Sequence, residues 1–369
     1  MNSDTLNPPQ YEFLDLIKFA YLNGASDIHV ESERSGMRVR VRKDGLLSEI
    51  KRIEPSRSLS FAENIKSLLG FDMAKFGEAQ DSRYAHPEIE VDLRANLLGS
   101  LYGEKLCLRL LERGKEFSLD AYPLEDKSKR KLQRLIKKNQ GLIIVSGPTG
   151  SGKSTLLYSI LGSIDRHNKA VYTVEDPVEY SLDNLIQIPI TKRVGFSEAL
   201  KSLMRQDPDV IMVGEIRDAE TAEAAVHAAN TGHLVLTTVH ANSAVEILTR
   251  LESLGVSKSI FESVVLFASA QRLPKKLCVN CRYEDQDAVP IVEDLFETKI
   301  NFTPKASRGC RACGGLGIDG RILIFEHLAM AREAGKRILK PWGSLKQQAF
   351  SAVKAGLIDA GEAYSNFGD

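Results

Sequence analysis

The chain has 369 residues, enough for two or three domains. Hydrophobic residues make up 43% of the sequence and charged residues 27%, a composition typical of folded domains with ample material for packed cores. Lysine plus arginine and aspartate plus glutamate both number 49, so the overall basic excess common in nucleic-acid-binding proteins is absent and no direct nucleic-acid partner is expected.

Neither a membrane span nor a secretory signal is expected from the sequence. No apolar run approaches the roughly 18 residues that a membrane-spanning helix needs. The N-terminus lacks the basic and apolar regions of a signal peptide.

Residues 1–122 predict a small α+β domain. Apolar residues at helical spacing predict a helix over 11–22, which Gly24 ends. Met37, Val39 and Val41 alternate with arginines and predict a half-buried strand, followed by a turn and a return strand. The other expected elements are strands over 25–31, 89–95 and 105–111 and a helix over 61–69.

Arginine is unusually frequent on the strands of this first domain. Arg38, Arg40 and Arg42 share one face of a strand, and Arg94 and Arg109 lie on later strands. One interpretation is a solvated sheet face with salt bridges. The other is a set of cations presented to nucleotide phosphates or to a neighbouring subunit.

Tyr122-Pro123-Leu124 interrupts the pattern and marks the expected boundary with a second domain, residues 123–369. A basic helix is expected over 127–139. Short apolar strands follow over 142–145, 171–174, 210–213 and 234–239, with helices between them, as over 156–161 and 219–231. Strands separated by helices predict an α/β fold with a mostly parallel sheet, in which ligands bind at the carboxyl ends of the strands. We expect the acidic and histidine residues near these strands to gather there.

The strand over 142–145 leads into a phosphate-binding pattern that fits G-x-x-x-x-G-K-[ST] at every fixed position. Its residues are Gly147, Pro148, Thr149, Gly150, Ser151, Gly152, Lys153, Ser154 and Thr155. Backbone N–H groups of such a loop converge on phosphate oxygens, at the positive end of the following helix. Lys153 is expected to reach the β- and γ-phosphates of ATP, and Ser154 to ligate Mg²⁺. A glycine turn that fits by accident is disfavoured because the flanking strand and helix are both present.

Four of the five cysteines form two C-x-x-C pairs: Cys278, Cys281, Cys310 and Cys313. Four thiolates in two pairs are typical of a closed structural zinc site, and the long gap predicts a small subdomain over 278–313. A redox pair or a chance pattern is the alternative. The remaining Cys107 is expected in the core.

Further blocks follow the strands of the second domain. They are Glu175-Asp176-Pro177-Val178-Glu179-Tyr180, Gly214-Glu215-Ile216-Arg217-Asp218, and Thr231-Gly232-His233 with His240. In this order, with the phosphate loop, they resemble the Asp box, Walker B and His box of the secretion ATPases of type II secretion and type IV pilus systems. Ala25-Ser26-Asp27-Ile28-His29-Val30-Glu31 resembles the N-terminal domain of the same family. The resemblance covers about residues 11–330.

The resemblance implies a RecA-like P-loop NTPase domain preceded by a PAS-like α+β domain. It assigns Glu179 as the general base or water-orienting carboxylate and Glu215 as the carboxylate near Mg²⁺. His233 and His240 would sense the γ-phosphate or couple it to the sheet, and the arginines that it offers to phosphate charge are Arg205, Arg83, Arg94 and Arg109. Alternatives stay open: His233 as a helix-terminus partner, and Glu175 and Asp176 as either structural residues or catalytic partners of Glu179.

The family implies a cytoplasmic hexameric ATPase that uses ATP and Mg²⁺, meets an inner-membrane platform protein, and drives polymerisation of pilin-like subunits. Assembly and secretion members carry a tetracysteine element with Zn²⁺, whereas retraction members generally lack it. Alternatives are a pilus-retraction or conjugative DNA-transfer ATPase of the same superfamily, and a ring scaffold that binds nucleotide without hydrolysing it.

Overall fold

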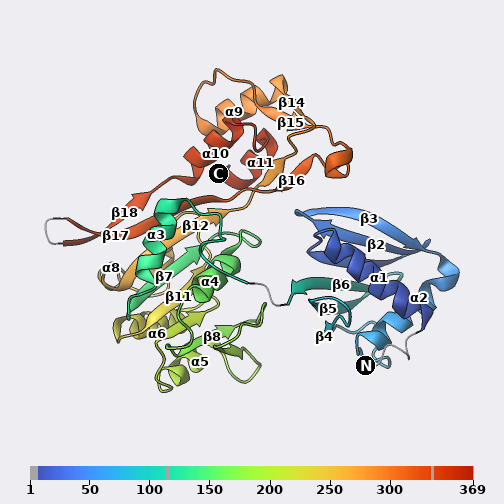
Figure 1. Ribbon diagram of the computed structural model, residues 1–369, viewed down its shortest axis with the longest axis horizontal. Helices are drawn as coiled ribbons and strands as arrows, with labels where there is room; N and C mark the ends of the chain where they lie inside the picture. Colours follow the sequence, from blue (N-terminus) through green and yellow to red (C-terminus); the bar gives the residue numbers. More distant parts are fainter. Residues whose placement is uncertain (1–6, 114–115, 334–335, 369) are drawn as a thin grey trace. The chain divides into compact units, whose positions relative to one another are not determined.

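The computed structural model describes residues 7–113, 116–333 and 336–368, and it divides into two compact units, Met1–Lys115 and Glu116–Asp369 (Figure 1). The division falls shortly before the boundary expected at residue 122. Phe117, Leu119 and Tyr122 are buried in a core of the second unit, so this stretch belongs to that unit.

The first unit is a six-stranded antiparallel sheet in the order β3-β2-β1-β6-β5-β4. Its elements are α1 (Pro8–Leu22), β1 (Asp27–Glu33), β2 (Gly36–Lys43), β3 (Leu46–Ile53), α2 (Pro55–Leu68), β4 (Gln80–Ala85), β5 (Val91–Ser100) and β6 (Gly103–Glu112). The two expected groups of strands form one sheet because β1 pairs with both β2 and β6. The α+β class predicted for this unit is confirmed.

The alternation of side chains along these strands separates a buried face from an open one. Ile28, Val30 and Leu108 are buried with Phe13 of α1 and Phe61 of α2. The residues between them point to the opposite face, which is largely polar. Cys107 lies on that face opposite His29 and is only half-buried, so the expectation that it packs in the core is wrong.

The second unit is built on an eight-stranded sheet in the order β18-β17-β12-β7-β11-β10-β8-β9. The strands are β7 (Gly141–Ser146), β8 (Val171–Glu175), β9 (Ile186–Pro189), β10 (Val210–Val213), β11 (Leu234–Val239), β12 (Val265–Arg272), β17 (Ile324–Glu333) and β18 (Lys336–Trp342). Along this sheet order, each pair of neighbouring strands in the stretch β12-β7-β11-β10-β8-β9 is parallel. Strands β17 and β18 add an antiparallel hairpin next to β12. The mostly parallel α/β sheet expected from the sequence is confirmed.

Helices cover both faces of this sheet, so its central strands β7 and β11 are buried along their whole length. One face packs against α3 (Asp126–Leu135) and α4 (Lys153–Gly162). The other packs against α5 (Phe196–Leu203), α6 (Ala219–Asn230), α7 (Glu246–Ser253) and α8 (Lys258–Val264). The basic helix α3 ends at Leu135, earlier than predicted, and Lys137 and Lys138 follow it.

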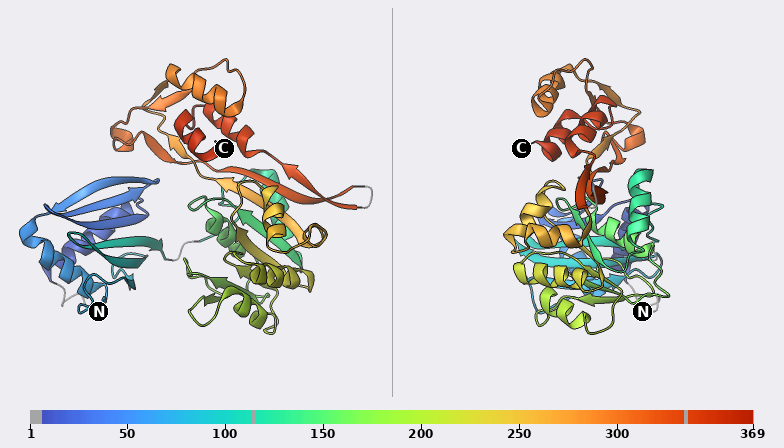
Figure 2. Two further views of the ribbon diagram at one scale, coloured as in Figure 1. Left: turned by 180° about the vertical axis from the view of Figure 1, so that it is seen from behind. Right: turned by 90° about the vertical axis from the view of Figure 1, so that its left-hand side faces the viewer.

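The cysteine-bearing segment is joined to the C-terminal helices. It holds β13 (Lys275–Leu277), β14 (Arg282–Glu284), η2 (Gln286–Ala288), α9 (Val289–Phe296), β15 (Lys305–Ser307), η3 (Arg311–Cys313) and β16 (Ile318–Arg321). Helix α9 packs against α10 (Leu345–Lys354) and α11 (Ala360–Phe367), because Val292 shares a core with Ala349 and Val353 (Figure 2). In the described part of the chain, no helix combines the length and apolarity needed to cross a membrane.

Candidate nucleotide-binding site

The expected phosphate loop connects β7 to α4, at the carboxyl end of the central strand. Gly147, Gly150 and Gly152 have φ angles of 145°, 78° and 85°, a region that residues with a Cβ rarely adopt. A Cβ on Gly147 would also lie 2.5 Å from the carbonyl oxygen of Gln271. The loop is therefore a backbone-lined turn whose N–H groups meet the positive end of α4, which is the arrangement that binds phosphate.

Lys153 opens α4 and folds back over the loop. Its Nζ donates to the carbonyl oxygens of Gly147 at 2.8 Å and Pro148 at 3.0 Å. Burial lowers the pKa of Lys153, against the opposing effect of the carboxylates of Glu215 and Glu179. The two acidic residues that the resemblance marked as functional therefore lie close enough to Lys153 to act on its charge.

Glu215 follows β10 and is 18% exposed in its side chain. One carboxylate oxygen pairs with Arg217, and the other lies 3.6 Å from Nε2 of His240. Arg217 also lies 3.8 Å from a carboxylate oxygen of Asp176, so it links the blocks that follow β8 and β10. No role was predicted for Arg217 from the sequence, where its position two residues after Glu215 is the available signal.

Glu175 ends β8 and resolves one open alternative. It is 4% exposed, and its carboxylate accepts from the hydroxyl of Tyr158, from Oγ1 of Thr173 at 2.5 Å, and from Nε2 of Gln187 at 3.0 Å. Three neutral donors occupy most of the acceptor sites of this buried carboxylate. The contacts of Glu175 join β8 to α4 and β9 and favour the structural alternative.

Glu179 lies in the half-buried segment after β8. The next residue, Tyr180, donates its backbone N–H to the hydroxyl of Tyr158 on α4 at 3.3 Å. Helix α4 therefore holds both the phosphate loop and the segment that carries Glu179. This arrangement suits a carboxylate that must be oriented against a bound phosphate.

Two of the expected catalytic residues do not lie at this edge of the sheet. His233 precedes β11, and its ring Nδ1 lies 3.0 Å from the carbonyl oxygen of Ala228 at the end of α6. The six residues of β11 span about 20 Å, which separates His233 from His240 at the other end. Arg205 is exposed in the segment between α5 and the start of β10. The expectation that both histidines gather at the carboxyl ends of the strands is wrong.

A cavity of about 410 Å³ adjoins the phosphate loop. Its walls include Gly147, Pro148, His240, Asn242, Glu246 and Arg250. His240 and the residues that follow it are therefore on one wall of this cavity, and the phosphate loop is on another.

Two contacts to the loop come from Arg321 and Gln271, residues for which no role at the nucleotide was predicted. Arg321 at the end of β16 donates to the carbonyl oxygen of Gly150 at 3.3 Å. Gln271 of β12 is fully buried, and its Nε2 donates to the carbonyl oxygen of Ser151 at 2.6 Å and to the hydroxyl of Tyr122 at 3.2 Å. No local pattern signals these residues, because they reach the loop only through strand pairing.

The arginines of the first unit fall into two groups. Arg40 and Arg38 pair with Glu31, and the hydrogen bond from Arg40 is the main cause that holds the pKa of Glu31 at about 2. The salt-bridge interpretation is therefore correct for β2.

Arg83, Arg94 and Arg109 form a different group, a row across three strands. They occupy directly paired positions on β4, β5 and β6, and all three are exposed. Arg109 lies 3.2 Å from Asp27, whereas in the described residues no carboxylate lies within 4.0 Å of Arg83 or Arg94. Like charges directly opposite each other destabilise a sheet, so the row is costly without an anion or carboxylate beside it.

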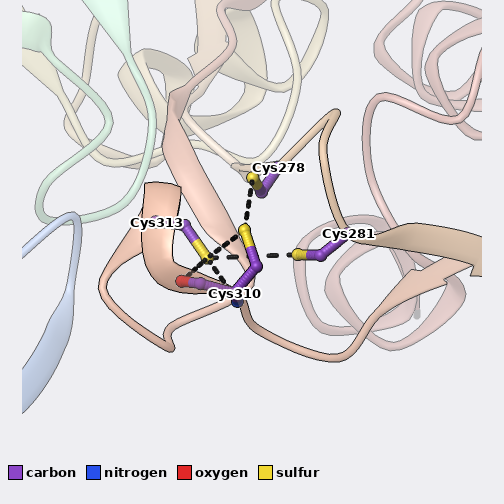
Figure 3. Close-up of side chains that lie close together, drawn as sticks. All are labelled: Cys278, Cys281, Cys310 and Cys313. Carbon is purple, nitrogen blue, oxygen red and sulfur yellow. Dashed lines mark hydrogen bonds between the residues drawn. The ribbon is translucent and has the colours of Figure 1, made fainter.

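The four cysteines of the second unit converge (Figure 3). The sulfur–sulfur distances are 3.9 Å between Cys278 and Cys310, 4.0 Å between Cys281 and Cys313, and 3.7 Å between Cys310 and Cys313. Four thiolates around zinc at about 2.3 Å would be about 3.8 Å apart at the corners of a tetrahedron. All four are free thiols, so the geometry fits a metal site and not a disulfide.

Backbone N–H groups support the second cysteine pair. Those of Cys310 and Gly317 donate to Sγ of Cys313 at 3.2 Å and 3.1 Å. Mainly through the first of these bonds, the pKa of Cys313 falls to about 6. The pairing of β13 with β16 brings the two halves of the cluster together across a long stretch of sequence.

A family model described as "Type II/IV secretion system protein" matches residues 9–367. The chain is 38% identical over 357 residues to the type IV pilus assembly ATPase PilB of Pseudomonas aeruginosa, which covers 94% of this chain and 62% of that protein. It is 38% identical over 345 residues to the putative type II secretion system protein E of Escherichia coli, covering 90% and 69% respectively.

Solved structures show the same fold. The pilus retraction motor PilT with bound ADP is 25% identical, with a TM-score of 0.63 over 96% of this chain and 97% of that one. The chain thus matches nearly all of the PilT structure but less than two thirds of the length of the P. aeruginosa relative.

Proposed function

The chain belongs to the type II/IV secretion system protein family, and we propose that it hydrolyses ATP to drive the assembly of a type IV pilus or a type II secretion pseudopilus. The observation that carries the proposal is the grouping of Lys153, Glu179, Glu215 and His240 around one phosphate loop. Phosphoryl transfer to water requires positioning and charge neutralisation more than covalent chemistry, and this grouping offers both.

Each residue of the site then has a stated task. The loop amides and Lys153 bind the β- and γ-phosphates, and Glu179 orients the attacking water and accepts its proton. Ser154 and Glu215 would hold Mg²⁺, which neutralises phosphate charge when bound. Arg217 and His240 fix the Glu215 carboxylate through the contacts described above.

The arginine row of the first unit is proposed to bind phosphate oxygens. Arg83, Arg94 and Arg109 present three neighbouring cations with one nearby carboxylate, that of Asp27. A single arginine at a transferring phosphoryl group can be worth roughly 10³–10⁵ in rate. Arg205 is exposed on the other unit and is not part of this row; as a phosphate contact it would act on the nucleotide of a neighbouring subunit. We assign His233 a structural role at the C-terminal end of α6, where its ring contacts the carbonyl oxygen of Ala228.

The cysteine cluster is proposed to hold a structural Zn²⁺. The sulfur–sulfur distances and the N–H groups directed at Cys313 both suit a closed tetrahedral site. Four protein ligands leave no coordination position for a reacting water, so zinc would stabilise the C-terminal helices and take no part in hydrolysis.

Under this proposal the protein is a homohexamer on the cytoplasmic side of the inner membrane. It meets a membrane platform protein directly and pilin-like subunits indirectly.

The names of the relatives and the tetracysteine element support assembly. Retraction is the second candidate, favoured by the structural likeness to PilT. Deletion separates the two, because loss of an assembly motor removes pili and loss of a retraction motor lengthens them.

An ATPase assay tests the core of the proposal. Lys153→Ala should bind ATP poorly and show no turnover, whereas Glu179→Gln should bind ATP and lose about 10²–10⁴ in kcat, the usual contribution of a general base. Matched controls are Lys192→Ala and Glu223→Gln, both at exposed positions away from the loop. Wild-type turnover in both test variants would refute the mechanism. Nucleotide binding without phosphate release in the wild type would identify a non-hydrolytic scaffold.

A further inference from the structure

Arg272 is a buried cation beside the phosphate loop that the proposed mechanism does not use. It is the last residue of β12 and is only 7% exposed. Its guanidinium donates from Nη1 to the carbonyl oxygen of Gln271 at 3.2 Å and from Nη2 to that of Asn242 at 3.0 Å. The side chain therefore spans from its own strand to the segment that follows β11.

The guanidinium is buried without a close counter-ion. Within the described ranges of the chain, no carboxylate lies within 4.0 Å of Arg272, and the acidic groups that act on it are Glu326 and Glu246. Each of these carboxylates already accepts a backbone N–H, Glu326 from Ala244 at 2.7 Å and Glu246 from Asn242 at 3.1 Å. Burying a guanidinium without a close counter-ion is costly, and the compensation here comes from two carbonyl bonds and the more distant Glu326 and Glu246. That cost indicates a task at the site.

The two carbonyls that Arg272 joins belong to opposite sides of the site. On one side, Gln271 holds the phosphate loop through the bond from its side chain to Ser151. On the other, Asn242 lies two residues after His240, whose ring faces Glu215 at 3.6 Å. Asn242 and His240 also line the same cavity next to the loop. Arg272 thus connects the His240 segment to the strand that supports the phosphate loop.

We propose that Arg272 is a positioning residue that holds the segment His240–Asn242 in register with the phosphate loop, so that His240 and Glu215 meet the γ-phosphate together. The inference rests on the proposed ATPase function. A guanidinium suits this task because it directs several N–H donors in fixed directions from one planar group. A lysine ammonium also has several donors, but they lie on one atom of a flexible side chain and lack the fixed, planar directions of the guanidinium.

Steady-state ATPase kinetics on Arg272→Gln and Arg272→Lys test the proposal, with the exposed Arg130→Gln on α3 as matched control. We expect Arg272→Gln to lose at least about tenfold in kcat, with KM for ATP changed less than about threefold and the melting temperature unchanged or raised. Arg272→Lys should fall between Arg272→Gln and wild type. Wild-type kcat in Arg272→Gln, or a loss that matches a fall in melting temperature, would overturn the proposal.

A double-mutant cycle separates positioning from a general structural effect. If Arg272 acts through His240, then His240→Gln should lower kcat much less in the Arg272→Gln background than in the wild type. Independent multiplication of the two effects would mean that Arg272 does not act through His240.

Hydrogen exchange gives a readout that does not depend on turnover. The amides of Asn242 and Ala244 donate to Glu246 and Glu326. Without the Arg272 anchor, these two amides should exchange faster in Arg272→Gln, while those of β11 stay protected. Unchanged exchange would refute the anchoring even if the wild type proved inactive. Absence of hydrolysis by the wild type, with faster exchange in the variant, would refute the proposed function alone.

Discussion

The two hydrogen bonds of the Tyr158 hydroxyl offer a direct test of the contacts that hold the site together. Tyr158 lies on α4, 1% exposed; its hydroxyl donates to Glu175 and accepts from the backbone N–H of Tyr180. Tyr158→Phe keeps the ring contacts with Phe117 and Tyr180 and removes only the oxygen. One charged and one neutral hydrogen bond are lost, which together should cost about 2–4 kcal/mol of unfolding free energy.

These two bonds connect α4 with the segment that carries Glu179, so their loss should also affect turnover. Without the Tyr180 bond the segment that carries Glu179 is no longer tied to the helix of the phosphate loop, so we expect kcat to fall about tenfold, equivalent to about 1.4 kcal/mol. KM for ATP should change little, because the loop amides and Lys153 are untouched. Urea unfolding and an ATPase assay measure the two effects on the same samples.

Tyr172→Phe is the matched control for this experiment. The hydroxyl of Tyr172 donates to the carbonyl oxygen of Gln206 at 3.2 Å in an exposed position away from the loop. This substitution should cost no more than about 0.5–1.5 kcal/mol and leave kcat unchanged. Equal losses of stability in the two variants, or a wild-type kcat in Tyr158→Phe, would refute the reasoning.

Three further outcomes are expected. The first unit should lose stability as pH falls from about 4 to about 2, because the pKa of Glu31 is about 2 in the folded protein and near 4.3 in the unfolded chain. Glu31→Gln should flatten this part of the curve of unfolding free energy against pH. An unaltered curve would exclude Glu31 as the cause. Purified protein should carry one zinc per chain, and Cys310→Ser should lose the metal and lower the melting temperature of the second unit, whereas Cys107→Ser should retain it; metal-free wild-type protein that melts like the metal-loaded form would contradict a structural role. Arg94→Gln should lower kcat at least tenfold, while Arg38→Gln, which removes an arginine paired with Glu31, should not; similar kcat values for both would remove the case for the arginine row.

The sequence was most informative where function depends on neighbouring residues. The phosphate loop, the turns of its glycines and the helix that follows are local, so Gly147–Thr155 could be recognised before any fold was known. The alternation of apolar residues likewise predicted β2, because burial on one face of a sheet repeats every second residue. Short apolar runs predicted β7, β8, β10 and β11, which are buried on both faces. The two C-x-x-C pairs, each of them local in sequence, predicted the four-cysteine cluster.

Distances between segments were decided by tertiary structure. Both histidines of the His box were expected beside the nucleotide. The extended strand β11 lies between them, so His233 lies at the opposite end of this strand from His240. Glu175 and Glu179 are four residues apart on one segment, and only the folded structure reveals the donors that surround Glu175.

The phosphate-loop pattern and the family to which the chain belongs could both be recognised from the sequence alone. The folded structure decided which polar side chains meet at the loop. Gln271 and Arg272 lie more than a hundred residues from the loop in sequence and contact it or its neighbours only because β12 pairs with β7. Side chains brought together by strand pairing have no fixed spacing along the chain, so no sequence pattern could have selected them.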